Sequence, residues 1–101
     1  MAPAPAKLVT IVTPFSARQR VVDVLTELGV RGYTAASVEG HGVHGDRVSS
    51  LFEHENVAFT IVVSGAIAAK LLAWVEDELA PTDPSIAYCA DVVAVPAGHF
   101  A

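Results

Sequence analysis

The sequence predicts an α+β sandwich, in which a four-stranded antiparallel sheet carries two helices on one face. Two observations predict this class. β-Branched apolar runs alternate with amphipathic stretches in the order strand, helix, strand, strand, helix, strand, which is a repeated βαβ unit. The chain has 101 residues, of which 52% are hydrophobic, and this suits one core in one domain.

The first half of the repeat is a strand, a helix and a second strand. Residues 7–13 are β-branched and mostly apolar, which indicates a buried strand that Pro14 closes. Apolar side chains then recur at helical spacing between Ser16, the expected N-cap, and Gly29, the expected C-terminal stop. Residues 33–39 alternate in polarity as a second strand does.

The second half repeats this order. Residues 57–64 form the strongest strand pattern in the chain, and Gly65 ends it. An amphipathic helix follows and stops at Pro81. Residues 85–95 read as a fourth strand, in which we expect Cys89 to be a small buried residue. The whole order βαββαβ predicts a ferredoxin-like sandwich.

The composition also predicts the oligomeric state, the domain boundaries and the cellular compartment. Only 17% of the residues are charged, and the sheet face without helices stays apolar, so we expect a closed homo-oligomer such as a trimer. We assign residues 1–6 to a flexible tail and residues 7–101 to the single domain. A lone cysteine permits no internal disulfide, and no targeting or membrane-spanning pattern occurs, so the expected compartment is the cytoplasm.

Charge and residue types also exclude several classes of function. The net charge is −5 and no Lys/Arg cluster occurs, which argues against nucleic acid or an anionic membrane as the partner. No Ser/His/Asp set, Cys/His set or isolated carboxylate pair stands out, so we do not expect an enzyme.

A glycine pair at the end of the second strand is the main functional signal. Gly40 and Gly42 flank His41, and without Cβ atoms they leave backbone N–H groups open to an anion such as phosphate or carboxylate. A tight turn without a ligand has the same local sequence. Arg47 follows in a polar loop of residues 43–56, where it can clamp an oxyanion or pair with Asp46 in solvent.

These features, taken in register, resemble the PII signalling superfamily. The resemblance covers residues 7–95 and is carried by the βαββαβ order, Gly32-Tyr33-Thr34, Gly40-His41-Gly42 and the strand at residues 59–63. It implies a trimer that binds an adenine nucleotide in the clefts between subunits, with no covalently bound cofactor. It also implies that the loop of residues 43–56 reports the ligand to a regulated protein partner.

The same resemblance implies roles for individual residues. The residues expected to bind nucleotide are Thr34, Gly40, His41, Gly42, Arg47, Val62, Thr82 and Asp83, with Thr34 and Val62 at the adenine end. Those expected to hold a bicarbonate effector are Gly42, Val43, His44 and Arg47.

The departures from the nitrogen-regulating members narrow the expectation. The loop of residues 43–56 has no tyrosine, residues 80–85 contain neither glycine nor lysine, and residues 91–95 contain no arginine. Positive charge for a triphosphate is therefore missing. The chain is most similar to the PII-like branch linked to inorganic carbon, which includes carboxysome-associated PII proteins and regulators of bicarbonate transporters. That branch implies ADP or AMP as the nucleotide and bicarbonate as a co-effector.

Two alternatives stay open at this stage. One is a trimeric metal-tolerance protein that uses His41, His44 and His54, although no cysteine or nearby carboxylate completes a tetrahedral set. The other is a structural interaction module whose loop binds a partner without any small ligand.

Overall fold

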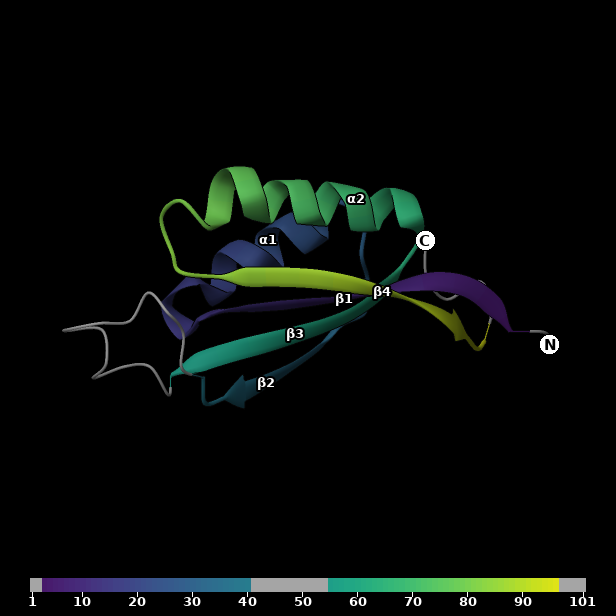
Figure 1. Ribbon diagram of the computed structural model, residues 1–101, viewed down its shortest axis with the longest axis horizontal. Helices are drawn as coiled ribbons and strands as arrows, with labels where there is room; N and C mark the ends of the chain where they lie inside the picture. Colours follow the sequence, from purple (N-terminus) through teal and green to yellow (C-terminus); the bar gives the residue numbers. More distant parts are fainter. Residues whose placement is uncertain (1–2, 41–54, 97–101) are drawn as a thin grey trace.

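The fold is a four-stranded antiparallel sheet with both helices on one face, as the sequence predicts (Figure 1). The computed structural model describes residues 3–40 and 55–96. The strand order is β2-β3-β1-β4, and every strand pairing is antiparallel. The elements are β1 (Ala4–Pro14), a 3₁₀ turn (Phe15–Ala17), α1 (Arg18–Glu27), β2 (Thr34–Val38), β3 (Asn56–Val63), α2 (Gly65–Trp74), a π-helical turn (Val75–Leu79) and β4 (Ile86–Ala94).

The core lies between the sheet and the two helices. Every second residue of the central strands β1 and β3 faces the helices, and Phe59 and Ile61 on β3 are fully buried. Helix α1 contributes Val21 and Leu25, and α2 contributes Leu71 to the same cluster. This burial is the main source of stability, because isolated helices of this length are marginal in water.

The predicted C-terminal ends of both helices are confirmed. Gly29 has a φ of +78°, the left-handed conformation that ends α1. Ser64 caps α2, since its hydroxyl accepts the N–H of Ile67 at 3.3 Å, and α2 with its π-helical turn ends at Leu79, just before Pro81. The prediction of Ser16 as an N-cap is wrong. Ser16 lies inside the 3₁₀ turn, and no side chain caps the start of α1.

Two further expectations need correction. Strand β1 begins at Ala4 rather than at Lys7, because β4 runs far enough to pair Ala94 with Ala4. Residues 4–6 therefore belong to the sheet and not to a flexible tail. Cys89 is exposed rather than buried. It lies on β4, an edge strand of the described sheet, so only one neighbouring strand flanks it.

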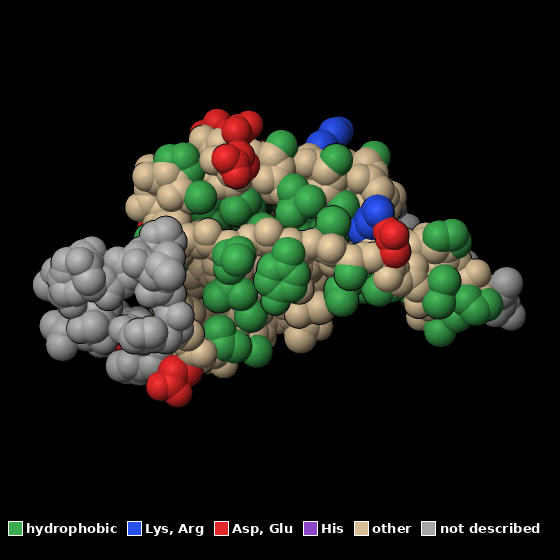
Figure 2. All heavy atoms as spheres, in the orientation of Figure 1, with side chains coloured by type: hydrophobic (Ala, Val, Ile, Leu, Met, Phe, Trp, Pro, Cys, Tyr) green, Lys and Arg blue, Asp and Glu red, His purple; other side chains and the backbone are tan. Residues whose placement is uncertain are grey.

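The sheet face without helices is continuous and mostly uncharged. Directly paired residues share a face, so Thr10 on β1 places Thr60 of β3 and Tyr88 of β4 beside it. Tyr88 and Ile86 are 55% and 59% exposed, which is high for large apolar side chains. Figure 2 shows hydrophobic side chains on the surface over β4, below the helical layer. We call the sheet face without helices, on which Thr10, Thr60, Ile86 and Tyr88 lie, the open face.

A pair between β1 and β4 gives a pH-dependent prediction. The Lys7 ammonium bonds Asp91, directly opposite in the register, and this hydrogen bond and charge raise the pKa of Lys7 above its ordinary 10.5. The pair's contribution is therefore fully present below the unfolded-state pKa and is lost as the pH rises through the folded-state pKa. We expect Asp91→Asn to lower Tm slightly, because both side chains are solvated. The difference from wild type should disappear once the pH has risen above the raised folded-state pKa of Lys7. A constant difference across the titration would contradict this assignment.

Candidate functional site

A hollow of about 300 Å³ lies on the open face, where β2 begins and β4 ends. Its walls are Gly32, Tyr33 and Thr34 before and at the start of β2, Thr60 and Val62 on β3, and residues 94–96 at the end of β4. Hydroxyl groups and backbone stand beside aliphatic surface, and no charged side chain of the described residues lines the hollow. Such walls suit a flat, uncharged ring with polar edges.

The wall of the hollow at the start of β2 is supported by a contact on the opposite side of the sheet. The Tyr33 ring lies 5.5 Å from the ring of Phe59, centroid to centroid, and the two planes are tilted by 55°. Phe59 is fully buried, so the contact fixes the start of β2 against the core. Thr34 follows directly and faces the open side, where it pairs with Thr60. The hollow therefore lies over a packed part of the core.

The structure divides the predicted site residues between two ends of the sheet. Thr34 and Val62 line the hollow. Gly40 lies beyond the other end of β2, six residues further on, which is about 20 Å of extended chain. A Cβ built on Gly40 would meet only Asn56 Nδ2, at 3.7 Å, so the local packing does not require glycine there.

Thr82 and Asp83 also lie away from the hollow, in the connection from α2 to β4. Ser85, two residues further on, shares a hydrogen bond of 2.8 Å with Thr13, next to the end of β1. This is the same end of the sheet as the end of β2, since Pro14 pairs with Asn56 and Asn56 with Val38. One chain therefore cannot bring both groups of residues to a single small ligand.

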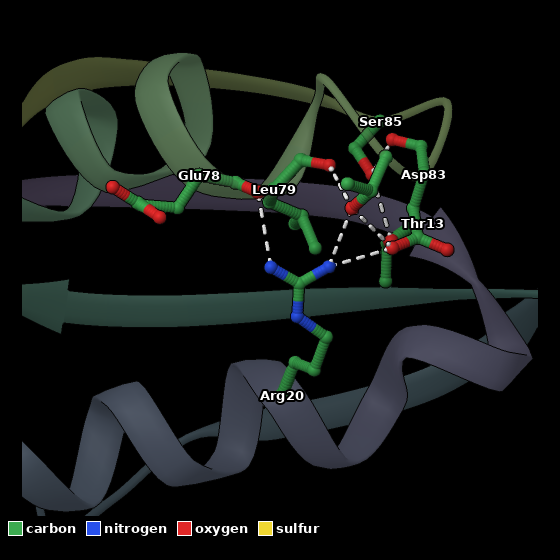
Figure 3. A network of polar contacts seen from close by, with 7 residues as sticks. Thr13, Arg20, Glu78, Leu79, Asp83 and Ser85 are labelled. Atoms are coloured by element: carbon green, nitrogen blue, oxygen red, sulfur yellow. Dashed lines mark hydrogen bonds and ion pairs between the residues drawn. The ribbon is translucent and has the colours of Figure 1, made fainter.

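Arg20 on α1 organises the connection from α2 to β4, as Figure 3 shows. Its Nη1 donates to Thr82 Oγ1 and to Asp83 Oδ2, both at 2.7 Å. Its Nη2 donates to the Glu78 carbonyl oxygen at 3.0 Å. The guanidinium also lies 6.0 Å from the ring centroid of Trp74. No local pattern in the sequence marks Arg20, because its hydrogen-bond partners are 58 to 63 residues away.

The remaining lining residues were not predicted as site residues, although the strand pattern could have indicated one of them. Thr60 lies two residues before Val62 on the same strand, so the period of two places both on one face. The walls formed by residues 94–96 had no comparable signal, because only the return of β4 brings them to the hollow.

Several predicted site residues lie outside the described residues. They are His41, Gly42, Val43, His44 and Arg47, together with His54 of the metal alternative and most of the loop of residues 43–56. Within residues 3–40 and 55–96, no group of three His, Cys, Asp or Glu side chains is placed to hold a metal ion. In the same ranges, no helix has the length and apolar character to cross a bilayer.

Comparisons with known proteins agree with this fold. A PII-like signalling protein from Thermus thermophilus, described as putative, is 34% identical over 94% of both chains, with a TM-score of 0.78. CPII from Thiomonas intermedia, a nitrogen regulatory PII-like protein solved with ADP, AMP and bicarbonate, has a TM-score of 0.77. It is 19% identical and covers 93% of this chain and 99% of its own. The same protein bound to ADP, AMP and acetate gives a TM-score of 0.83 at 18% identity, over 99% of this chain and 98% of its own.

A search of curated proteins gives no match. The family model described as nitrogen regulatory protein P-II, in contrast, matches residues 6–99, nearly the whole chain. The chain therefore belongs to the P-II family of nitrogen regulatory proteins.

Proposed function

We propose that this chain is a trimeric regulatory sensor that binds an adenine nucleotide, ADP or AMP, in the clefts between its subunits. The observation that carries the proposal is the division of the predicted site residues. Thr34 and Val62 line the hollow, whereas Gly40 and Thr82 lie at the opposite end of the sheet. A ligand that contacts both groups must therefore lie between two protomers.

The open face supplies the surface for such an assembly. It is apolar at Ile86 and Tyr88, both more than half exposed in the single chain. The face carries no helix in the described structure, and burying it against copies of itself would stabilise a closed ring. In the assembly that we propose, the hollow of one protomer lies beside the glycine pair of its neighbour.

The chemistry of the two half-sites assigns the parts of the ligand. The adenine ring lies in the uncharged hollow, against Val62 and within reach of the hydroxyls of Thr34 and Thr60. The phosphates point to the neighbour's backbone N–H groups at Gly40 and Gly42, with His41 and Arg47 nearby. Few cations are available there, which favours ADP or AMP over ATP. The ligands in the Thiomonas CPII structures support this choice.

We further propose that bicarbonate is a second effector. Gly42, Val43, His44 and Arg47 hold it beside the phosphates, and the bound ligands order the loop of residues 43–56 for recognition by a protein of inorganic-carbon metabolism. The bicarbonate in a solved Thiomonas CPII complex supports this effector. The protein acts in the cytoplasm, with the carboxysome as one location, and has no enzymatic activity of its own.

Calorimetric titration tests the proposal directly. The purified protein is titrated with AMP, ADP and ATP, each with and without bicarbonate, and with copper and zinc as separate arms. We expect saturable binding of ADP or AMP at one site per chain, and a change of that affinity when bicarbonate is present. Heat with metal and none with any nucleotide would refute the proposal and favour the metal-tolerance alternative.

A substitution in the hollow gives the sharpest variant. Thr34→Tyr places a phenol ring where the adenine is expected, on an exposed edge-strand residue whose replacement costs little stability. We expect the affinity for ADP to fall by at least about tenfold, since one lost ring contact is worth about 1.4 kcal/mol or more. Ser37→Tyr on the same strand, on its other face, is the matched control and should bind ADP as wild type does.

A further inference from the structure

We propose that Arg20 is a positioning residue of the nucleotide site, and that its pairing with Asp83 limits the number of phosphates that the site accepts. This inference rests on the proposed function. It starts from the connection of residues 80–85, which Figure 3 shows held to α1 by a single guanidinium.

The guanidinium makes three hydrogen bonds, two to the connection and one to the π-helical turn before it. One nitrogen bonds Thr82 Oγ1 and Asp83 Oδ2, each at 2.7 Å, and another bonds the Glu78 carbonyl at 3.0 Å. The Thr82 hydroxyl itself lies 3.0 Å from Asp83 Oδ2 and 3.2 Å from the Leu79 carbonyl. These groups form one network, so the side chains of Thr82 and Asp83 have a defined orientation.

The end of the second helix explains why the connection needs this support. The last carbonyls of a helix have no partner within the helix. Here the Leu79 carbonyl accepts the N–H groups of Thr82 and Asp83, at 3.1 and 2.9 Å. The Glu78 carbonyl accepts from Arg20, so a residue of α1 caps α2. A cation at this position also interacts favourably with the negative end of the helix dipole.

Contacts further along complete the anchoring. Ser85 Oγ donates to the Asp83 carbonyl at 2.9 Å and contacts Thr13 Oγ1 at 2.8 Å. The connection is therefore fixed to α1 through Arg20 and to β1 through Thr13. Two anchors from different elements hold the connection in one conformation, which lowers the entropy that binding would cost.

The charge of this network bears on the ligand. The Arg20 and Asp83 side chains are 42% and 25% exposed. An anion in a neighbouring cleft would therefore interact electrostatically with both charges. The carboxylate offsets the guanidinium, and within residues 3–40 and 55–96 no second Lys or Arg side chain bonds this connection. The pair leaves the connection close to neutral, so each phosphate added to the ligand gains little net attraction from it and a longer phosphate chain is not favoured.

Two substitutions change this charge in opposite directions. Asp83→Asn removes the carboxylate and leaves the Arg20 charge available, so the affinity for ATP should rise relative to AMP, by about threefold per added phosphate. Arg20→Gln leaves Asp83 uncompensated, so the affinity should fall by a factor that grows from AMP to ADP to ATP. A merely structural role would weaken all three nucleotides by the same factor.

The experiment combines calorimetry with hydrogen exchange. AMP, ADP and ATP are titrated into wild type, Arg20→Gln, Asp83→Asn and two charge controls outside the network, Arg18→Gln on α1 and Glu76→Gln on the π-helical turn. Amide exchange at Thr82 and Asp83 is measured without ligand, and we expect it to be faster in Arg20→Gln than in wild type.

The outcomes separate this inference from the proposed function. If wild type binds nucleotide but the AMP-to-ATP ratio is unchanged in both variants, the inference is wrong and the proposed function stands. If wild type binds no nucleotide, the proposed function fails, and the exchange rates alone decide whether Arg20 anchors the connection. If Arg20→Gln does not fold, the ratio measured for Asp83→Asn decides the charge argument.

Discussion

Ala58→Glu is expected to give a folded monomer of 10.5 kDa that has lost nucleotide binding. Ala58 lies on β3 in the middle of the open face, paired with Ala36 on β2 and Val12 on β1. In the single chain a carboxylate there stays in water, whereas in the proposed trimer it would be buried without a partner. Such burial costs several kcal/mol per subunit and therefore strongly opposes association.

Light scattering and calorimetry with ADP measure this result. The matched control is Ala69→Glu, which adds the same charge on the exposed surface of α2, away from the open face. It should remain trimeric and bind ADP. If Ala58→Glu stays trimeric, or if its monomer binds ADP as wild type does, the site is not shared between protomers across this face.

Phe59→Ala, one residue further along the same strand, is expected to have the largest effect on folding. Phe59 points to the helices, is fully buried and is the largest side chain of the core without exposure. Its truncation removes apolar burial and leaves a cavity, which costs about 3–5 kcal/mol. Domains of this size have a total free energy of unfolding of about 5–15 kcal/mol. The variant should therefore lose a large part of its stability and be partly unfolded.

Urea denaturation followed by circular dichroism checks this value. Tyr33→Leu is the informative companion, because Tyr33 contacts the Phe59 ring but is 39% exposed. It should cost about 1 kcal/mol, from the aromatic contact and partial burial. Equal losses for the two variants would place the centre of the core elsewhere.

The sequence predicted the fold where a residue's neighbours along the chain determine its environment. The alternation in residues 57–64 correctly predicted β3, and Gly29 correctly ended α1. The errors arose where segments distant in the sequence determine a residue's pairing or exposure. Ala4 and Pro5 resemble a tail, yet β4 extends far enough to pair with them. Cys89 lies in an apolar strand, but its position at the sheet edge leaves it exposed.

The candidate site was less predictable for the same reason. Thr34 and Val62 were expected together at the adenine end, and the structure places both in one hollow, while their role in binding stays a prediction. Arg20 carried no local signal, because helical spacing only marks it as an exposed cation. Its partners depend on how α1 packs beside the end of α2, and short-range patterns do not encode that contact.

The distance between the two ends of β2 has a consequence for the cell. In the proposed assembly, a newly made chain cannot bind its effector until it has associated with other copies, because each chain carries two half-sites that belong to different binding sites. Abundance of the protein then becomes part of the signal. Dilution below the association threshold would silence the response even when the metabolite is plentiful.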